Sequence, residues 1–185
     1  MRLKRDFFRQ NVYDLAQTLL GKVLCINREG KLEKYRIVET EAYGGVTDKA
    51  AHSYNDRKTK RTAVMYDDGG HLYIYLIYGM YYMLNVVANV IGIPEAVLIR
   101  AIEPLDKKAK NIRTNGPGKL CRHLGIDMSY YGVDLTTSHD IYLIDDEYMV
   151  DKVTQTTRIN VDYAEEDKDL LWRFYLTNNP YVSKK

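Results

Sequence analysis

The sequence contains 185 residues, a length typical of one domain with a substantial hydrophobic core. Its 27 Lys and Arg and 25 Asp and Glu residues give a formal net charge of +2, which does not by itself indicate a polyanionic partner. No run approaches the roughly 20 apolar residues of a membrane span, and the opening segment MRLKRDFFRQN is charged instead of forming a hydrophobic leader. We therefore expect a soluble protein with one domain, residues 1–185, and no membrane contact.

The cysteine and tyrosine content narrows the class of protein further. Cys25 and Cys121 lack the CxxC or Cys/His spacing of a zinc site. We expect a reduced, intracellular protein without structural zinc. Tyrosine outnumbers phenylalanine by 17 to 3, so many large side chains carry a hydroxyl group that needs a partner or water. This composition favours surfaces and pockets over a dry core.

The first half of the chain predicts a helix followed by strands. Leucines at helical spacing in residues 15–20 precede Gly21, a plausible stop. The expected strands cover residues 23–26 and 32–42, joined by a hairpin at Glu29 and Gly30. Residues 44–62 lack strand alternation and predict a long exposed loop with one short helical turn.

The second half predicts more strands than helices. Strands are expected at residues 71–77, 81–88, from 96 to Pro104, at 141–145 (IYLID) and at 158–163 (RINVDY), and a short helix at 118–126. The fold class that follows is α+β, a single domain with a curved, mostly antiparallel sheet and peripheral helices.

The segment YRIVETEAY carries the first group of candidate catalytic side chains. A period of two separates Val38, Thr40 and Ala42 from the opposite face, which holds Tyr35, Ile37, Glu39, Glu41 and Tyr43. Paired acids beside aromatic rings suit hydrolysis of a glycosidic bond, in which one carboxylate activates water. The alternative is an ordinary solvated strand face.

Polar and basic residues follow these acids. His52 suits a hydrogen bond to a substrate, although a lone histidine is often structural. Two basic clusters suit phosphate contacts or simple solubility. Their members are Arg57, Lys58, Lys60 and Arg61 in one, and Lys107, Lys108, Lys110 and Arg113 in the other.

The segment NGPGKLC offers a further anion site. It lacks the GxxxxGK[ST] spacing of a nucleoside triphosphate loop. A helix that begins after Gly116 still has free backbone N–H groups beside Lys119, which suit one DNA phosphate. A glycine-proline helix start without a ligand is the alternative.

The tyrosine-rich stretch HLYIYLIYGMYYMLN predicts two strands joined by a tight turn. Alternation places His71, Tyr73 and Tyr75 on one face, and on the core face Leu72, Ile74 and Leu76. Tyr78 and Gly79 interrupt the pattern, so Tyr78 is expected at a hairpin tip, where a ring can wedge into a base stack. Tyr73 and Tyr75 suit the wall of a pocket for a planar base. A tyrosine-rich sheet face packed under a loop is the alternative.

Five segments together resemble the alkyladenine (methylpurine) DNA glycosylase family, in the same order. They are VETEAYGGVTDKAAHS, HLYIYLIYGMYYMLNVV, LIRAIEPL, NGPGKLC and RFYLTNNPYVS. The resemblance implies a monofunctional base-excision repair enzyme that flips alkylated or deaminated purines, such as 3-methyladenine, 7-methylguanine or hypoxanthine, out of duplex DNA. It also implies hydrolysis of the N-glycosidic bond, no metal or organic cofactor, and a monomer in the cytoplasm, associated with the nucleoid in a bacterium.

The resemblance assigns the catalytic roles. Glu41 corresponds to the general base that deprotonates the attacking water, with Glu39 as its neighbour. Arg100 corresponds to the arginine that helps to hold this water and the sugar-phosphate. The backbone carbonyl of Ile159 corresponds to a further contact with the water.

The resemblance also assigns the DNA-binding residues. Tyr43, His52 and Tyr75 correspond to the residues that enclose the extruded base, and Asn85 to the residue that crowds the purine 2-position and disfavours guanine. Tyr78 corresponds to the wedge that fills the vacated space in the duplex.

Three departures from the family pattern accompany the resemblance. The segment between Leu105 and Gly116 is shorter than expected, Asn160 stands where glycine is favoured, and Asp67 and Asp68 adjoin the expected DNA face.

Two other functions remain open at this stage. A damaged-DNA-binding module without chemistry would need the tyrosine hairpin and basic loops but not Glu41. A carbohydrate glycosidase would use Glu39 and Glu41 as an acid pair, but residues two apart on a strand lie roughly 7 Å apart and point the same way.

Overall fold

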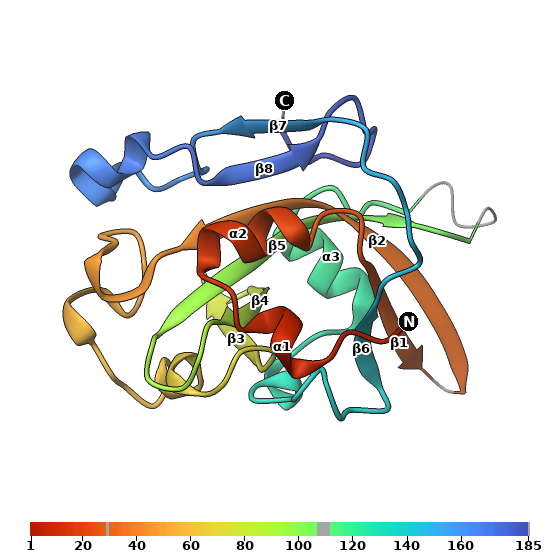
Figure 1. Ribbon diagram of the computed structural model, residues 1–185, viewed down its shortest axis with the longest axis horizontal. Helices are drawn as coiled ribbons and strands as arrows, with labels where there is room; N and C mark the ends of the chain where they lie inside the picture. Colours follow the sequence, from red (N-terminus) through yellow and green to blue (C-terminus); the bar gives the residue numbers. More distant parts are fainter. Residues whose placement is uncertain (29, 107–111, 185) are drawn as a thin grey trace.

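The computed structural model describes residues 1–28, 30–106 and 112–184, and these form one curled antiparallel sheet with few helices (Figure 1). The α+β class predicted from sequence is confirmed. The main path of the sheet has the strand order β3-β4-β5-β2-β1-β6, with β8 paired to β2 and β7 to β8. The strands are β1 (Val23–Arg28), β2 (Lys31–Tyr43), β3 (Leu72–Ile77), β4 (Tyr81–Ala88), β5 (Glu95–Pro104), β6 (Ile141–Ile144), β7 (Val153–Thr156) and β8 (Arg173–Leu176).

Strand β2 is the centre of the sheet because it changes partner along its length. One edge pairs with β5, whereas the other pairs first with β1, up to Arg36, and then with β8, from Glu39 to Glu41. The pairing with β5 is irregular between Ile37 and Thr40. Such irregularities bend a strand and redirect its side chains.

This irregularity corrects the face assignment made from alternation. Tyr35 and Ile37 do not share the face of Glu39, because they belong to the main hydrophobic core together with Val38 and Ala42. Consecutive residues Ile37 and Val38 both pack into that core, so the period of two fails at this point.

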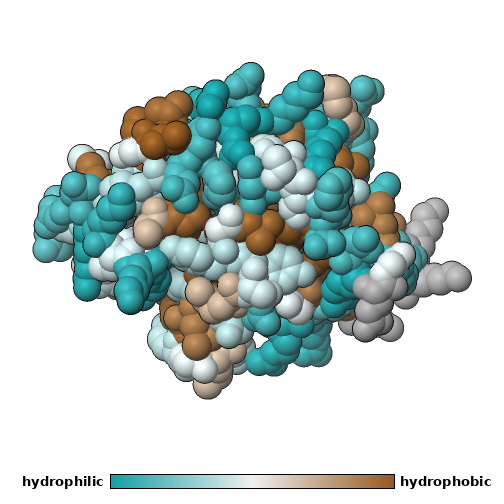
Figure 2. Space-filling view, turned by 90° about the horizontal axis from the view of Figure 1, so that it is seen from below, coloured by the Kyte–Doolittle hydropathy of each residue, from teal (hydrophilic) through white to brown (hydrophobic). Residues whose placement is uncertain are grey.

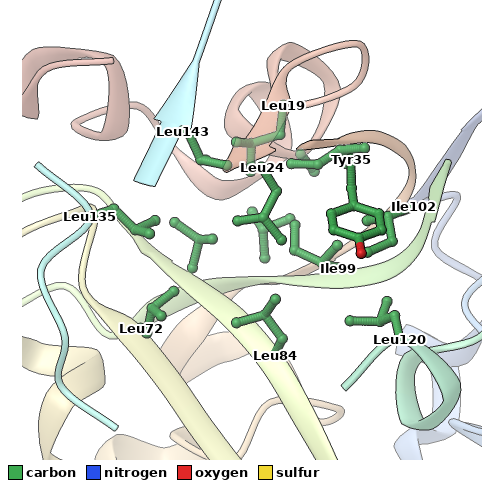
Figure 3. Close-up of a cluster of buried hydrophobic side chains, with 14 of the residues drawn as sticks. Leu19, Leu24, Tyr35, Leu72, Leu84, Ile99, Ile102, Leu120, Leu135 and Leu143 are labelled. Atoms are coloured by element: carbon green, nitrogen blue, oxygen red, sulfur yellow. The ribbon is translucent and has the colours of Figure 1, made fainter. Parts of the chain in front are cut away.

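The helices are short and complete the core (Figure 3). Leu15 of α2 (Val12–Thr18) and Leu120 of α3 (Pro117–Leu124) lie in the same cluster as the strand residues. Helix α1 (Arg5–Phe8) adds the buried Phe8. The remaining helical turns are 3-10 helices: η1 (Gly45–Thr47), η2 (Tyr54–Asp56), η3 (Ala63–Tyr66), η5 (Met128–Tyr130) and η6 (Asp162–Asp169).

Most predicted elements are confirmed, with three corrections. Residues 158–163 are not a strand, because Asn160 adopts a left-handed backbone with φ of 60° and η6 begins at Asp162. Leu76 is 43% exposed instead of facing the core. The strands β7 and β8 were not predicted, and residue 29 of the predicted first hairpin lies outside the described residues.

The predicted loop 44–62 is exposed only in part. Asp48, Ser53 and Thr62 are buried, and the Ser53 hydroxyl donates to the carbonyl of Pro94 at 2.8 Å. The exposed residues are Val46, Thr47 and the stretch from Asn55 to Arg61. Ser53 therefore ties the loop to the main chain just before β5, and the Thr62 hydroxyl closes the basic tip by donating to the carbonyl of Arg57 at 2.9 Å.

The surface carries scattered apolar groups. Figure 2 shows hydrophobic residues in separate patches among hydrophilic ones on one face. No helix formed by the described residues has the length and apolar character needed to cross a bilayer. Both Cys25 and Cys121 are buried and have free thiols.

Gly69 lies where α1 meets the loop after β4, and this contact generates a stability prediction. A Cβ atom at residue 69 would stand 2.5 Å from the carbonyl oxygen of Phe8 and 2.8 Å from that of Asn89. We expect Gly69→Ala to lower the free energy of unfolding by about 2 kcal/mol or more, because the main chain at Phe8 and Asn89 must move to accommodate the methyl group. The measurement is urea denaturation.

Gly132→Ala is the matched control. Nothing lies within 4 Å of a Cβ atom there, and the φ of 77° accounts for a loss of only about 1 kcal/mol. Equal losses for the two variants would contradict the proposed clash.

Candidate active site

Glu41 is buried in the middle of the sheet and is held by three donors. Its side chain is 0% exposed. One carboxylate oxygen, Oε1, accepts the backbone N–H of Ile159 at 2.7 Å, and Oε2 accepts from the Tyr43 hydroxyl at 2.9 Å and Arg100 Nη1 at 3.2 Å. A carboxylate has about four acceptor positions, so one more hydrogen bond, for example from water, can be accommodated.

Glu39 is equally buried and accepts four hydrogen bonds. Oε1 accepts from Arg100 Nε at 3.0 Å, Arg173 Nε at 2.8 Å and the Ser183 hydroxyl at 2.8 Å. Oε2 accepts the backbone N–H of Ser183 at 2.6 Å. The solvated-face alternative for the two acids is therefore wrong, and Glu39 pairs with two guanidinium groups, whereas Glu41 pairs with one.

Arg100 links the two carboxylates. Its Nε binds Glu39, its Nη1 binds Glu41, and its Nη2 lies 3.5 Å from the Ser183 hydroxyl. The two buried acids are balanced by Arg100 and Arg173, an arrangement that avoids an unpaired buried charge. The two carboxylates raise the pKa of Arg100 despite the opposing effect of burial, so the guanidinium stays charged.

An aromatic cavity of about 380 Å³ adjoins this cluster. Its size falls in the range of small-ligand sites. Three residues that bind or flank Glu41 line it: Tyr43, Arg100 and Ile159. The sequence-predicted residues His52, Tyr75, Tyr78 and Asn85 also line the cavity, as do residues that were not predicted, including Met65, Met83, Asn160 and Tyr163.

His52 stands between two tyrosines in the cavity wall. Its Nδ1 lies 2.8 Å from the Tyr73 hydroxyl, and its ring meets that of Tyr75 edge-on at 4.6 Å between centroids. Burial, with added repulsion from Arg61 and Arg57, lowers the pKa of His52 to about 4. The imidazole is therefore neutral near pH 7.

Tyr43 and Tyr75 present rings to the same cavity. Removal from water, followed by the charge of Glu41, raises the pKa of the Tyr43 hydroxyl well above its usual value. It stays protonated and donates to Glu41. Burial also raises the pKa of Tyr75.

Asn85 and Tyr78 lie on the strand pair β3 and β4. The Asn85 amide donates to the carbonyls of Tyr73 and Met83 at 3.0 and 3.3 Å, which fixes the side chain in the cavity wall. Tyr78 is 76% exposed in the connection between the strands and has a φ of 54°. Positive φ is strained for an aromatic residue, and such strain is common at functional positions.

The predicted phosphate-binding residues lie at the surface. Arg57, Lys58, Lys60 and Arg61 are all exposed at the tip of the loop before η3. Arg57 and Arg61 also line a second cavity that shares His52 with the first. Lys119 is exposed in the first turn of α3, where its Nζ donates to Asn115 at 3.2 Å. Of the second predicted cluster, Arg113 is exposed, and Lys107, Lys108 and Lys110 lie outside the described residues.

Two of the departures from the family pattern have a structural explanation. Asn160 adopts the left-handed backbone that favours glycine, and asparagine is one of the residues that tolerates this conformation best. Asp68 accepts two hydrogen bonds from Arg9, at 3.0 and 2.7 Å, so its charge is paired, whereas Asp67 is exposed.

A buried ion pair that sequence reasoning missed joins the two chain segments around the cavity. Arg158 binds both oxygens of Asp48, at 2.5 and 2.9 Å, and its guanidinium lies over the ring of Tyr43 at 5.0 Å. Asp48 belongs to the loop that carries His52, and Arg158 precedes Ile159. Asp48 and Arg158 are 110 residues apart in the sequence, so no local sequence pattern could reveal that they pair.

Within the part of the chain that the structure describes, no group of three or more His, Cys, Asp or Glu side chains is arranged to hold a metal ion.

Comparison with known proteins agrees with the resemblance seen in the sequence. The model of the methylpurine-DNA glycosylase family matches residues 6–180. A relative from Clostridium novyi is 45% identical over 203 positions, covering 100% of this chain and 99% of its own length. One from Bdellovibrio bacteriovorus is 47% identical over 192 positions, with 100% of both chains covered. Both carry the name "Putative 3-methyladenine DNA glycosylase".

A chain with this curled antiparallel sheet and this buried acid cluster, matched over almost its whole length, belongs to the methylpurine-DNA glycosylase family. The alignments of 203 and 192 positions exceed the 185 residues of this chain. These relatives therefore contain residues with no counterpart here, and the shortened segment between Leu105 and Gly116 stays a prediction.

The lowered pKa of His52 generates a prediction about stability. Between pH 6.5 and about 4 the unfolded chain binds a proton at His52 and the folded protein does not. The folded state therefore loses up to about 3 kcal/mol as the pH falls through this window. We expect His52→Asn to lose less stability than the unmodified protein between pH 7 and pH 4.5, measured by urea denaturation.

The exposed His139 provides the control. His139→Asn should follow the pH dependence of the unmodified protein. An unchanged pH dependence in His52→Asn would rule out a buried neutral imidazole.

Proposed function

We propose that this protein is a DNA glycosylase that releases alkylated or deaminated purines from duplex DNA and leaves an abasic site. The observation that carries the proposal is the buried Glu41 carboxylate, which accepts hydrogen bonds from Tyr43, Arg100 and the Ile159 N–H, three residues that line an aromatic cavity. The family match supports the same chemistry.

The proposed reaction is hydrolysis with one carboxylate base. A water molecule bound to Glu41 attacks the sugar C1′, its proton passes to the carboxylate, and the electron pair of the C1′–N bond leaves with the base. An alkylated purine such as 3-methyladenine or 7-methylguanine already carries positive charge, so it departs without much help from an acid. The neutral hypoxanthine needs a proton on the leaving group.

The cavity suits a purine that has rotated out of the helix. Tyr43 and Tyr75 supply aromatic faces, and the neutral His52 supplies a polar contact. The main-chain contacts of Asn85 hold its amide rigidly, which supports a role in excluding the amino group of guanine. A damaged base pairs and stacks more weakly, so flipping it costs less by a few kcal/mol.

The same face suits contact with duplex DNA. The exposed basic loop that contains Arg57 and Arg61 shares His52 with the cavity, so phosphates bound there would flank the flipped nucleotide. Lys119 lines another hollow, separate from the one beside Arg57 and Arg61, and this hollow shares Tyr78 and Arg100 with the aromatic cavity. Tyr78 would take the place of the missing base as a wedge between neighbours.

Replacement of the proposed base tests the mechanism. Glu41→Gln keeps the size of the side chain but cannot accept a proton, so we expect release of 3-methyladenine from methylated duplex to fall by about 10² to 10⁴-fold. Binding to the lesion duplex should persist. The assay is chromatography of free base without added metal.

The exposed Glu147 supplies the control, because Glu147→Gln should retain full activity. Unchanged excision by Glu41→Gln would eliminate Glu41 as the base. No release by the unmodified protein, together with lesion binding, would favour the non-catalytic binding module.

Replacement of the exposed tyrosine tests the wedge. We expect Tyr78→Ala to weaken binding to lesion duplex by about 1 to 3 kcal/mol, the usual contribution of one stacked ring. Tyr78→Phe retains the ring and should bind like the unmodified protein. The measurement is fluorescence anisotropy with labelled duplex, and equal affinity of Tyr78→Ala and Tyr78→Phe would contradict the wedge.

A further inference from the structure

The cluster around Glu39 contains donors from the end of the described chain that the proposed chemistry does not use. After β8, Asn178 adopts a left-handed backbone and the chain turns back, with Val182 buried. The residues that follow reach the two buried acids. Ser183 then provides two of the four hydrogen bonds to Glu39, through its backbone N–H and its hydroxyl.

Ser183 also contacts Arg100 directly. The Ser183 hydroxyl lies 3.5 Å from Arg100 Nη2 and donates to Glu39 at 2.8 Å. Arg100 is thus held at Nε by Glu39 and at Nη2 by Ser183, and its Nη1 is left for Glu41 at 3.2 Å. A planar guanidinium fixed at two nitrogens has the direction of the third determined.

The C-terminal segment has a second attachment through Arg173. Nη2 of Arg173 donates to the carbonyl of Lys184, while its Nε binds Glu39 at 2.8 Å. Lys184 and Ser183 also line the hollow that contains Lys119 and Arg100. The segment therefore forms part of the wall next to the catalytic cluster instead of ending at a remote surface.

We propose that Ser183 is a positioning residue, which acts with Glu39 to fix the guanidinium of Arg100 against the Glu41 carboxylate. The C-terminal segment then completes the active site from a position about 140 residues away from the acids in sequence. This inference rests on the proposed function of Glu41 and Arg100. Precise placement matters, because small shifts of a catalytic group reduce rates strongly.

The test measures two quantities separately. One is the rate of base release at saturating enzyme, and the other is the affinity for duplex. We expect Ser183→Ala to lower the single-turnover rate on hypoxanthine-containing duplex about tenfold. Its affinity for the same duplex with a 2′-fluoro sugar, which resists hydrolysis, should stay within twofold. Ser183→Thr retains a hydroxyl and should recover most of the rate. Ser129→Ala, at an exposed serine that contacts Asp127, is the matched control and should keep the full rate.

A double-mutant cycle with Arg100→Lys separates positioning from simple destabilisation. Lysine has one side-chain nitrogen instead of the planar guanidinium group that Ser183 is proposed to orient. Ser183→Ala should therefore cause no further loss of rate in the Arg100→Lys background. Independent, multiplicative losses, or a Ser183→Ala rate equal to that of the unmodified protein, would overturn the inference. If the unmodified protein released no base at all, the proposed function would fail instead.

Discussion

The candidate site depends on the pairing of two buried carboxylates with two guanidinium groups at the middle of β2. Isolated ionised groups in this position would be very costly. Arg100 and Arg173 remove that cost, and backbone N–H groups of Ile159 and Ser183 satisfy the remaining oxygens. The charges are therefore tolerable only when segments from β2, β5, β8 and the C-terminal end have all assembled.

This interdependence distinguishes the two acids. Glu39 accepts from Arg100, Arg173 and Ser183, whereas Glu41 accepts from Tyr43, Arg100 and Ile159, all three of which line the cavity. The irregular pairing near Val38 permits the arrangement, because it lets Ile37 and Val38 both pack into the core while the acids face the arginines. A regular strand would have placed Tyr35 and Ile37 beside Glu39.

Local sequence patterns predicted those strands and helices whose formation depends mainly on residues close together in the chain. The alternation located β3 and the buried Leu72 and Ile74 correctly, but Tyr73 of the opposite face is buried as well and Leu76 is exposed. The resemblance to the glycosylase family is confirmed, and the residues it assigned, from Tyr43 to Arg100, do gather at one cavity. Their individual roles stay predictions.

Long-range contacts explain what the sequence did not reveal. RINVDY alternates like a strand, yet Arg158 is drawn into an ion pair with Asp48, 110 residues away. The shift of alternation at Val38 accompanies the irregular pairing of β2 with β5, which no local residue type marks. The contacts of Ser183 with Glu39 likewise join distant segments.

The strained backbone at Tyr78 has a consequence for the role in DNA binding that we propose for this residue. The ladder between β3 and β4 continues to the pair Ile77 and Tyr81, and the N–H of Met80 closes the connection by donating to Ile77 at 3.2 Å. The direction of the Tyr78 Cα–Cβ bond is thus set during folding. The free energy of folding carries the cost of this backbone conformation, so the proposed insertion into a duplex would require less ordering of the main chain.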